Sequence, residues 1–234
     1  MRCRIADLIV EIPEAGGMSP RCQAYLTESD GSADIVIRQE ECDLAPWISA
    51  GESMAWYMVT GCHFYVNLVR FQATMLHASA VALDGRAYLF SGPSGVGKST
   101  HTRLWQRLFP GAEVFNDDKP ALRLLEGRWY AYGTPWSGKD EINLNKKVPL
   151  AGICFLKQGT ANRIRRLSAP EAVPLIYGQT YYKLTKPENA ERLLQVVDAL
   201  IRSIPIYELE NRPEEAAAQL SWQTMLEGAQ TAGL

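Results

Sequence analysis

The chain has 234 residues, of which 47% are hydrophobic and 21% charged, and its formal net charge is −2. This length and balance are typical of one large globular domain with or without a small appendage, and they argue against a disordered chain. The small net charge gives no electrostatic case for a nucleic-acid partner. The sequence has no run of roughly 18 apolar residues, so no membrane-spanning helix is predicted.

The cysteines are odd in number, and none belongs to a C-x-x-C pair: Cys3, Cys22, Cys42, Cys62 and Cys154. Such a dispersed set predicts reduced thiols and a cytoplasmic protein rather than disulfides or a zinc site. The N-terminal segment contains Asp7 and Glu11 and has no unbroken apolar stretch, so no signal peptide is expected.

Residues 1–72 are predicted to form a small α+β appendage. Residues 4–12 have strand character, and 23–27 with 33–38 are expected to form a hairpin around a polar turn. A helix is predicted over 53–71, interrupted at Gly61, with a strand near 64–69 as the alternative. No catalytic constellation is visible here, which favours a structural or substrate-facing role.

Residues 73–234 are predicted to form the main domain, which begins with a β-hairpin. A strand over 75–83 is followed by the turn Asp84-Gly85, and 86–91 is expected to return antiparallel to it.

The rest of this domain alternates strands and helices. Further strands are predicted at 112–115, 121–125, 128–132, 148–156, 163–167 and 204–209. Helices are predicted at 100–109, 189–202 and 213–226, and another helix is predicted to begin after Ser168 as its N-cap. The tail after Gly228 is expected to fray. The aromatic residues Trp129, Tyr130, Tyr181 and Tyr182 are expected in the core. Together these elements predict an α/β fold, with a mixed, largely antiparallel sheet flanked by helices.

The loop between the strand at 86–91 and the next helix carries the strongest motif of the chain. Its sequence fits G-x-x-x-x-G-K-[ST] at every fixed position, in the strand–loop–helix context that this phosphate-binding motif requires. The predicted binding residues are Gly92, Pro93, Ser94, Gly95, Val96, Gly97, Lys98, Ser99 and Thr100. Main-chain amides would hold phosphate oxygens, Lys98 would reach the β- and γ-phosphates, and Ser99 would bind Mg²⁺. The alternative is a glycine-rich turn that matches by chance.

An acidic pair, Asp117 and Asp118, ends the strand that follows this helix. Phosphoryl transfer needs a carboxylate near Mg²⁺ and a group that accepts the proton of an acceptor hydroxyl. Adjacent residues at a strand end can face different sides, so each can serve one role. The competing interpretation is a polar turn, for which Asn-Asp-Asp is also suited.

Three more side chains are weaker candidates. His77 lies on the strand that the hairpin brings beside the motif, and it either contacts phosphate or the acidic pair or is a core residue. Lys139 lies in the loop 133–140. It either screens the negative charge of the phosphoryl group during transfer or belongs to an exposed linker. His101, on the first turn of the helix, either touches the nucleotide or only covers it.

The chain resembles the HPr kinase/phosphorylase-like family, within the group that includes the ATP-type phosphoenolpyruvate carboxykinases. The resemblance rests on the segments L-H-A-S-A-V at 76–81, G-T-P-W-S-G-K at 133–139 and V-P-L-A-G-I at 148–153, together with the glycine-rich loop and the acidic pair. It is similar in particular to short HPr kinase-related proteins, some of which phosphorylate serine on a precursor peptide. Thr100 stands where the bifunctional enzymes carry an acidic residue.

This resemblance implies a kinase that uses ATP and Mg²⁺ and phosphorylates a serine hydroxyl of a peptide or small protein. The implied catalytic residues are Lys98, Asp117, Asp118, His77 and Lys139, and the implied metal ligands are Ser99 and the acidic pair. Related enzymes form oligomers, so the resemblance leaves open whether this chain forms a homo-oligomer. Two other functions compete: a kinase for a small-molecule acceptor, and a nucleotide-binding regulatory module without phosphoryl transfer.

Overall fold

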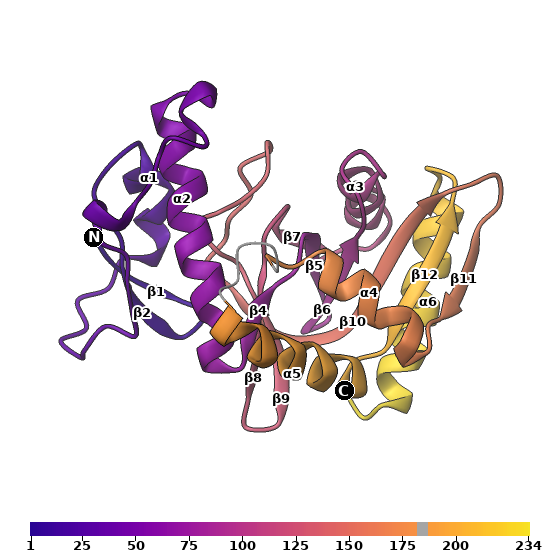
Figure 1. Cartoon of the computed structure of the whole chain (residues 1–234). Coiled ribbons are helices and arrows are strands. Elements are labelled where there is room, and N and C mark those ends of the chain that lie inside the picture. The colour runs from indigo at the N-terminus through magenta and orange to yellow at the C-terminus, as the bar shows by residue number, and fades with distance from the viewer. Residues whose placement is uncertain (182–186) are drawn as a thin grey trace.

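The computed structural model describes residues 1–181 and 187–234, and Figure 1 shows their arrangement. The helices are α1 (Met18–Cys22), α2 (Glu52–Asn67), α3 (Lys98–Leu108), α4 (Ala169–Gly178), α5 (Pro187–Ser203) and α6 (Glu215–Thr231). The strands are β1 (Arg2–Ile5), β2 (Leu8–Glu11), β3 (Ile35–Val36), β4 (Ala73–Met75), β5 (Ala78–Leu83), β6 (Arg86–Ser91), β7 (Glu113–Asn116), β8 (Ala121–Leu125), β9 (Arg128–Tyr132), β10 (Lys147–Gln158), β11 (Arg163–Arg166) and β12 (Ile206–Asn211).

A mixed sheet forms the centre of the fold. Within the described residues it has nine strands, in the order β4-β8-β9-β10-β6-β5-β7, with β12 beside β10 and β11 beside β12. The long strand β10 connects its two parts, because its first residues pair antiparallel with β9 and its later residues pair parallel with both β6 and β12. The other pairs described in this sheet are antiparallel, so the predicted mixed, largely antiparallel sheet flanked by helices is confirmed.

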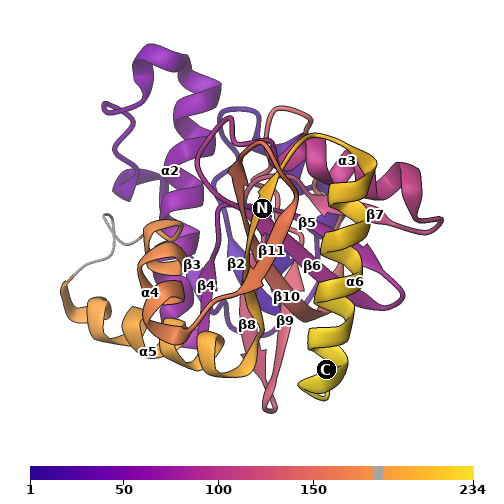
Figure 2. The same ribbon diagram turned by 90° about the vertical axis from the view of Figure 1, so that its right-hand side faces the viewer.

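Helices cover both faces of this sheet, as Figure 2 shows. Side chains alternate between the two faces of a strand, and both faces of β5 are apolar. Ala80 and Ala82 belong to a cluster that α4 and α5 complete, whereas Val81 and Leu83 belong to a cluster with α3 and α6. Burial on both faces explains why the sequence of β5 is apolar at every position except Ser79.

The predicted hairpin before the glycine-rich loop is confirmed. Strands β5 and β6 pair antiparallel from Ala78 with Ser91 to Leu83 with Arg86, around the turn Asp84-Gly85. The hairpin of β8 and β9 and the capping box that joins Ser168 to Glu171 at the start of α4 also agree with the sequence. These elements depend on local turn and cap chemistry, which a sequence carries directly.

The prediction of one strand over 75–83 is wrong, because the chain leaves the sheet at Leu76 and His77. The main-chain N–H of His77 donates to the carbonyl of Gln179 after α4 (2.8 Å). β4 therefore pairs with β8 and β5 with β6, and His77 lies in the gap between them instead of on a strand. The hydrogen bond to Gln179 connects residues that are far apart in sequence, so no local pattern indicates it.

Several predictions in the N-terminal region are also wrong. Residues 4–12 form two strands instead of one, since Ala6 and Asp7 have positive φ and make a tight turn between β1 and β2. The expected hairpin of 23–27 with 33–38 is absent from the structure, because β3 pairs parallel with β2. Asp34 fixes that pairing through two hydrogen bonds with the main chain of Ile9, each 2.8 Å long.

The helix predicted over 53–71 is confirmed in most of its length, and the alternative strand is wrong. α2 runs through Gly61 without interruption, and residues 68–71 add a 3₁₀ turn. Its buried aromatic residues Phe64 and Tyr65 join the N-terminal strands in one apolar cluster that also contains Tyr132 and Trp136. Residues 1–72 thus share a core with the end of β9 and the loop that follows it.

The C-terminal tail does not fray as predicted after Gly228. α6 continues to Thr231, and the carbonyl of Leu234 accepts a hydrogen bond from Arg86 Nε (3.3 Å). Of the predicted core aromatic residues, Trp129 is fully buried, Tyr130 and Tyr181 are partly buried, and Tyr182 lies outside the described residues. Among residues 1–181 and 187–234, no helix has the length and apolar character that would let it cross a bilayer.

Candidate functional site

The glycine-rich segment forms the loop between β6 and α3, as the motif requires. Gly92 has a φ of +138°, and a Cβ there would lie 3.2 Å from the carbonyl oxygen of Leu156. Gly95 has a φ of +81° in open space at the tip of the loop. The loop therefore needs glycine at position 92 for close packing and at position 95 for its backbone conformation.

Lys98, the first residue of α3, lies across this loop. Its ammonium donates hydrogen bonds to the carbonyls of Gly92 (2.9 Å) and Pro93 (3.3 Å). Burial lowers the pKa of Lys98, and the nearby charge of Asp118 opposes that effect. The lysine thus sits between the loop and the acidic pair, which is the position that the motif predicts for a phosphate-binding lysine.

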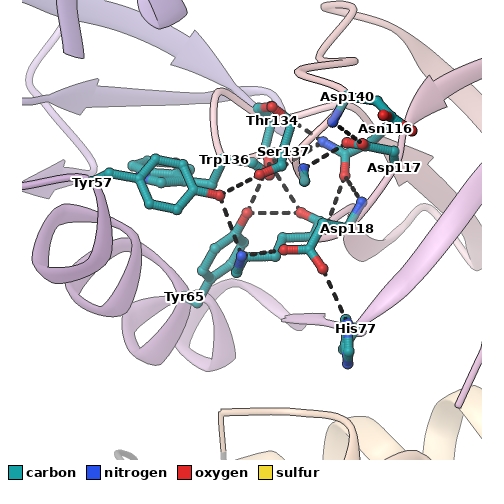
Figure 3. Close-up of polar contacts among 12 residues, drawn as sticks. Tyr57, Tyr65, His77, Asn116, Asp117, Asp118, Thr134, Trp136, Ser137 and Asp140 are labelled. Carbon is teal, nitrogen blue, oxygen red and sulfur yellow. Dashed lines mark hydrogen bonds and ion pairs between the residues drawn. The ribbon is translucent and has the colours of Figure 1, made fainter. Parts of the chain in front are cut away.

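Asp117 follows β7 and is held by main-chain amides. Its carboxylate accepts hydrogen bonds from the N–H groups of Gly138 (2.6 Å) and Asp140 (3.3 Å), and Figure 3 shows these contacts. Burial raises the pKa of Asp117, and the two amide hydrogen bonds act in the opposite direction. The loop 133–140 therefore fixes the orientation of the first carboxylate.

Asp118 is held by charged side chains instead. His77 Nε2 lies 3.1 Å from Asp118 Oδ1, and the Lys119 ammonium forms an ion pair with the other carboxylate oxygen (Figure 3). Burial alone would raise the pKa of Asp118, but the hydrogen bond from His77 and the charge of Lys119 together lower it to about 2. The second carboxylate is therefore ionised over the whole physiological range.

His77 is oriented by a further contact, since its Nδ1 lies 3.0 Å from Oε1 of Gln179. A glutamine oxygen only accepts, so Nδ1 carries hydrogen. The ring of His77 is thus held between the side chains of Gln179 and Asp118.

Asn116 ties the acidic pair to the loop 133–140. Its side-chain oxygen accepts hydrogen bonds from the main-chain N–H groups of Asp118 (3.1 Å) and Lys119 (2.7 Å). Its amide group donates to the carbonyl of Thr134 (3.2 Å). This fully buried residue therefore sets the backbone turn that carries both carboxylates.

Helix α2 supports the same turn from the N-terminal region, as Figure 3 shows. Tyr57 donates to the carbonyl of Ser137 (2.5 Å), and the Lys119 ammonium lies 3.2 Å from the Tyr57 hydroxyl. Tyr65 donates to the carbonyl of Lys119 (2.7 Å). Residues 1–72 contain no candidate catalytic group, but they hold the acidic side of the site.

Trp136 anchors the loop 133–140 in that region. Its ring is fully buried, is stacked on Phe64 with ring centroids 4.9 Å apart, and donates from Nε1 to Thr60 Oγ1 (3.2 Å). A Cβ at Gly61 would come within 2.9 Å of the ring, which explains why glycine occurs inside α2. Residues 133–137 are thus buried, and the exposed-linker alternative is wrong for them.

The loop, the acidic pair and His77 surround one open depression of about 480 Å³. It is lined by His77, Ser94, Gly95, Gly97, Lys98, Ser99, Thr100, Asp117, Asp118, Gly138 and Lys139. Every predicted catalytic residue lies in this set, with Lys139 exposed at its rim. Of the predicted loop residues, Gly92, Pro93 and Val96 lie outside the lining.

The donor set of the depression fits Mg²⁺. Magnesium prefers oxygen ligands, and in phosphoryl-transfer sites it binds one or two carboxylates together with substrate phosphates and water. Ser99, Asp117 and Asp118 supply such oxygens on the same depression. Residues 1–181 and 187–234 contain no group of three His, Cys, Asp or Glu side chains suited to hold a metal.

Sequence reasoning missed the residues that position the site. Lys119 follows the acidic pair directly, and its charge next to two carboxylates was the one visible signal for it. Tyr57, Tyr65 and Gln179 reach the site from distant segments, and no spacing indicates them. His101 does not line the depression: it is buried against Phe90 and α6, and burial lowers its pKa to about 4.

Comparison with known proteins gave one family and one structural neighbour of note. The family model described as SynChlorMet cassette protein ScmC matches residues 41–213. A comparison with curated proteins found no match. The solved structure of the Hpr(Ser) kinase/phosphatase from Coxiella burnetii is similar over 68% of this chain and 96% of that one, at 13% identity and a TM-score of 0.39.

Proposed function

The chain belongs to the family of SynChlorMet cassette protein ScmC, and on that premise we propose that it is an ATP-dependent kinase whose acceptor is a hydroxyl group. The observation that carries the proposal is the shared depression. Lys98 and Ser99 of the phosphate-binding motif line it together with Asp117, Asp118 and His77. These are the types of residue that phosphoryl transfer requires, and they come from three separate segments of the chain.

The reaction follows from the positions of these groups. The main-chain amides of the loop and the Lys98 ammonium hold the triphosphate, so that the γ-phosphorus faces the acidic pair. The acceptor oxygen forms a bond to the γ-phosphorus as the bond to the bridging oxygen of ADP breaks. One carboxylate of the acidic pair takes the hydroxyl proton. Magnesium, held by Ser99 and the acidic pair, would neutralise charge on the phosphates.

We propose a serine of a peptide or small protein as the acceptor. The depression opens between residues that are themselves exposed, namely Ser94, Gly95, Thr100 and Lys139. A side chain presented by a larger molecule can therefore reach the acidic pair without passing through a closed channel. The exposed ammonium of Lys139 at the rim would screen the transferred charge.

Transfer from ATP to a panel of acceptors tests this function. The purified chain is incubated with ATP and Mg²⁺ and with serine-containing peptides, their serine-to-alanine counterparts, free serine and simple sugars, and each acceptor is examined by mass spectrometry. We expect the serine peptides alone to gain a phosphoryl group. Modification of free serine or a sugar alone would indicate a small-molecule kinase, and binding without transfer would indicate a regulatory module.

A pair of lysine variants ties the activity to the depression. Lys98→Ala removes the ammonium that lies across the loop, and we expect it to abolish transfer. Lys157→Ala, at an exposed position near the end of β10, is the matched control and should leave transfer unchanged. Equal activity of the two variants would contradict the proposed site.

A further inference from the structure

A groove beside α2 has no part in the site described above. Its volume is about 530 Å³, and its lining comes mainly from β3, residues 41–47 and α2. The α2 residues on its wall include Val59, His63 and Val66. At about 100° per residue, these side chains leave the helix on the side opposite to Tyr57 and Tyr65, which hold the acidic turn. The groove and the acidic turn are therefore separated by the width of one helix, about 10 Å.

The edge of β3 at this groove is open. β3 is the last strand of the three-stranded sheet, and within the described residues it pairs only with β2. The N–H of Ile37 donates to the carbonyl of Glu11 at the end of β2 (2.9 Å). Successive residues of a strand direct their main-chain groups to alternate sides, so the N–H and C=O of Val36 point away from β2. An edge of this kind can pair with a further strand.

Val36 also joins the groove to a second hollow. This hollow has a volume of about 410 Å³, and Val36, Ile37 and Gln39 are part of its lining. The side chain of Val36 is 41% exposed, whereas those of Ile35 and Ile37 are each 3% exposed. A strand placed along β3 would run from one hollow into the other and cover this valine. The shape therefore suits an extended peptide better than a small molecule.

The wall of the groove combines a free carboxylate with an indole ring. The carboxylate of Asp43 accepts a hydrogen bond from the N–H of Ala45 (3.0 Å), and in the part of the chain that the structure describes it forms no ion pair. Glu41, on the same wall, is instead paired with Arg38 (3.0 Å). Trp47 lies on this wall as well. A carboxylate and an indole face both attract a cation, so the groove favours a basic side chain.

We propose that this groove, given the proposed transfer to a peptide serine, binds an extended segment of the acceptor peptide as an additional strand on β3, with a lysine or arginine side chain at Asp43 and Trp47. Main-chain pairing with Val36 provides affinity, and the basic side chain provides specificity. The phosphorylated serine lies in another part of the same peptide, on the other side of α2. About five or more extended residues, each spanning roughly 3.3 Å, connect the two by following half the circumference of the helix.

Binding of arrayed peptides tests the groove without any phosphoryl transfer. The probes are serine-free peptides of about nine residues, which is long enough to cross both hollows. In each array one position is fixed in turn as each amino acid, and the other positions are random. We expect the wild type to retain the arrays in which lysine or arginine is fixed at one position. Retention of no array, or retention without a preference for a basic residue, would overturn the proposal.

A proline variant tests the pairing with the edge of β3. Val36→Pro removes the N–H that points away from β2, and proline is tolerated at such edge positions. We expect it to weaken the best retained peptide about tenfold, because one hydrogen bond is lost and the proline ring occupies the edge. Val36→Thr keeps both main-chain groups and is the matched control. Equal affinities of the proline variant and the wild type would overturn the added strand. A dimer of the wild type that Val36→Pro dissociates would assign the edge to a second copy of the chain and overturn the peptide.

An aspartate variant tests the basic side chain. We expect Asp43→Asn to weaken the best retained peptide about fivefold and to leave its counterpart with norleucine at the basic position unchanged. Asp84→Asn, on the exposed turn between β5 and β6, is the matched control. An equal loss for both peptides, or no loss for either, would overturn the assignment of Asp43.

Transfer kinetics separate the groove from the proposed function. The retained segment is joined to a serine, and we expect Val36→Pro and Asp43→Asn to raise KM for this peptide while kcat stays the same. Phosphorylation with an unchanged KM in both variants would overturn the groove and leave the kinase. Retention of the peptide by the wild type without any transfer from ATP would overturn the proposed function and leave the groove.

Discussion

The two sides of the depression are built in different ways. On one side, the loop 92–97 consists largely of main chain, with Pro93, Ser94 and Gly95 exposed, and Lys98 bonds to carbonyls of that same loop. On the other side, the acidic turn 116–119 is held by side chains from α2 and from the segment between β4 and β5, and by main-chain amides of the loop 133–140. The first side depends mainly on contacts within the loop, with one side-chain hydrogen bond from the distant Gln158 to the carbonyl of Gly95, and the second side depends mainly on distant contacts.

This difference indicates a division of labour. The loop can adjust to a polyphosphate with little effect on the rest of the molecule, since few side chains pack on its tip. The acidic turn is preorganised, because a shift of either carboxylate would break hydrogen bonds with several elements. Substitutions on the acidic side should therefore affect turnover and stability strongly, and substitutions at the loop tip should affect stability weakly.

The largest effect is expected from the acidic pair itself. Asp117→Asn keeps the shape of the side chain but removes its capacity to accept a proton, and we expect turnover to fall about 10²–10⁴-fold. Nucleotide affinity, measured by calorimetry, should change only a few-fold. Asp118→Asn is measured in parallel, and the larger loss identifies the base. If both variants keep full turnover, neither carboxylate takes part in proton transfer.

The next largest effect concerns the packing that supports the acidic turn. Trp136→Ala would leave a cavity against Phe64 and Gly61, and we expect the free energy of unfolding to fall by about 3–5 kcal/mol. Val96→Ala, on the partly exposed loop, is the counterpart and should cost less than about 1.5 kcal/mol. Urea unfolding of both variants measures these changes. Similar losses would show that the two sides do not differ in stability.

The same contrast explains how far the sequence could predict the fold. The hairpins β5–β6 and β8–β9 and the start of α4 follow from local turn and cap residues, so their predicted positions were confirmed. The break at His77 and the parallel pairing of β3 depend on hydrogen bonds to distant residues, so the predictions there were wrong. The N-terminal turn at Ala6 and Asp7 has no glycine or asparagine to indicate it.

For the site, the sequence predicted the groups but not their supports. The motif at 92–99 and the pair Asp117–Asp118 were visible because their spacing is local, and the structure places them on one depression. The ion pair of Lys119 with Asp118 was not predicted. Tyr57 and Tyr65 could not be predicted, because tyrosines of a buried helix are usually core residues and their hydroxyl partners lie 54 or more positions away.

A smaller effect should appear at acidic pH. His77 and Lys119 lower the pKa of Asp118 from 3.8 to about 2, so the ionised carboxylate stabilises the folded state above pH 4. This contribution, roughly 2 kcal/mol, should be lost as the pH falls from about 4 to 2. The unfolding free energies of the wild type and Asp118→Asn should therefore converge over this range. A difference that is constant with pH would show that the carboxylate is not paired in the folded protein.

The smallest effect is expected at the tip of the loop. In Gly95→Ala the new Cβ meets no atom within 4 Å, so the only cost is the positive φ of +81°, which is worth about 1–2 kcal/mol. The neighbouring variant Ser94→Ala has no such cost and serves as the control. Thermal unfolding of both variants measures the difference. A loss as large as that of Trp136→Ala would mean that the loop tip is coupled to the core, and the two sides of the depression would then be equally rigid.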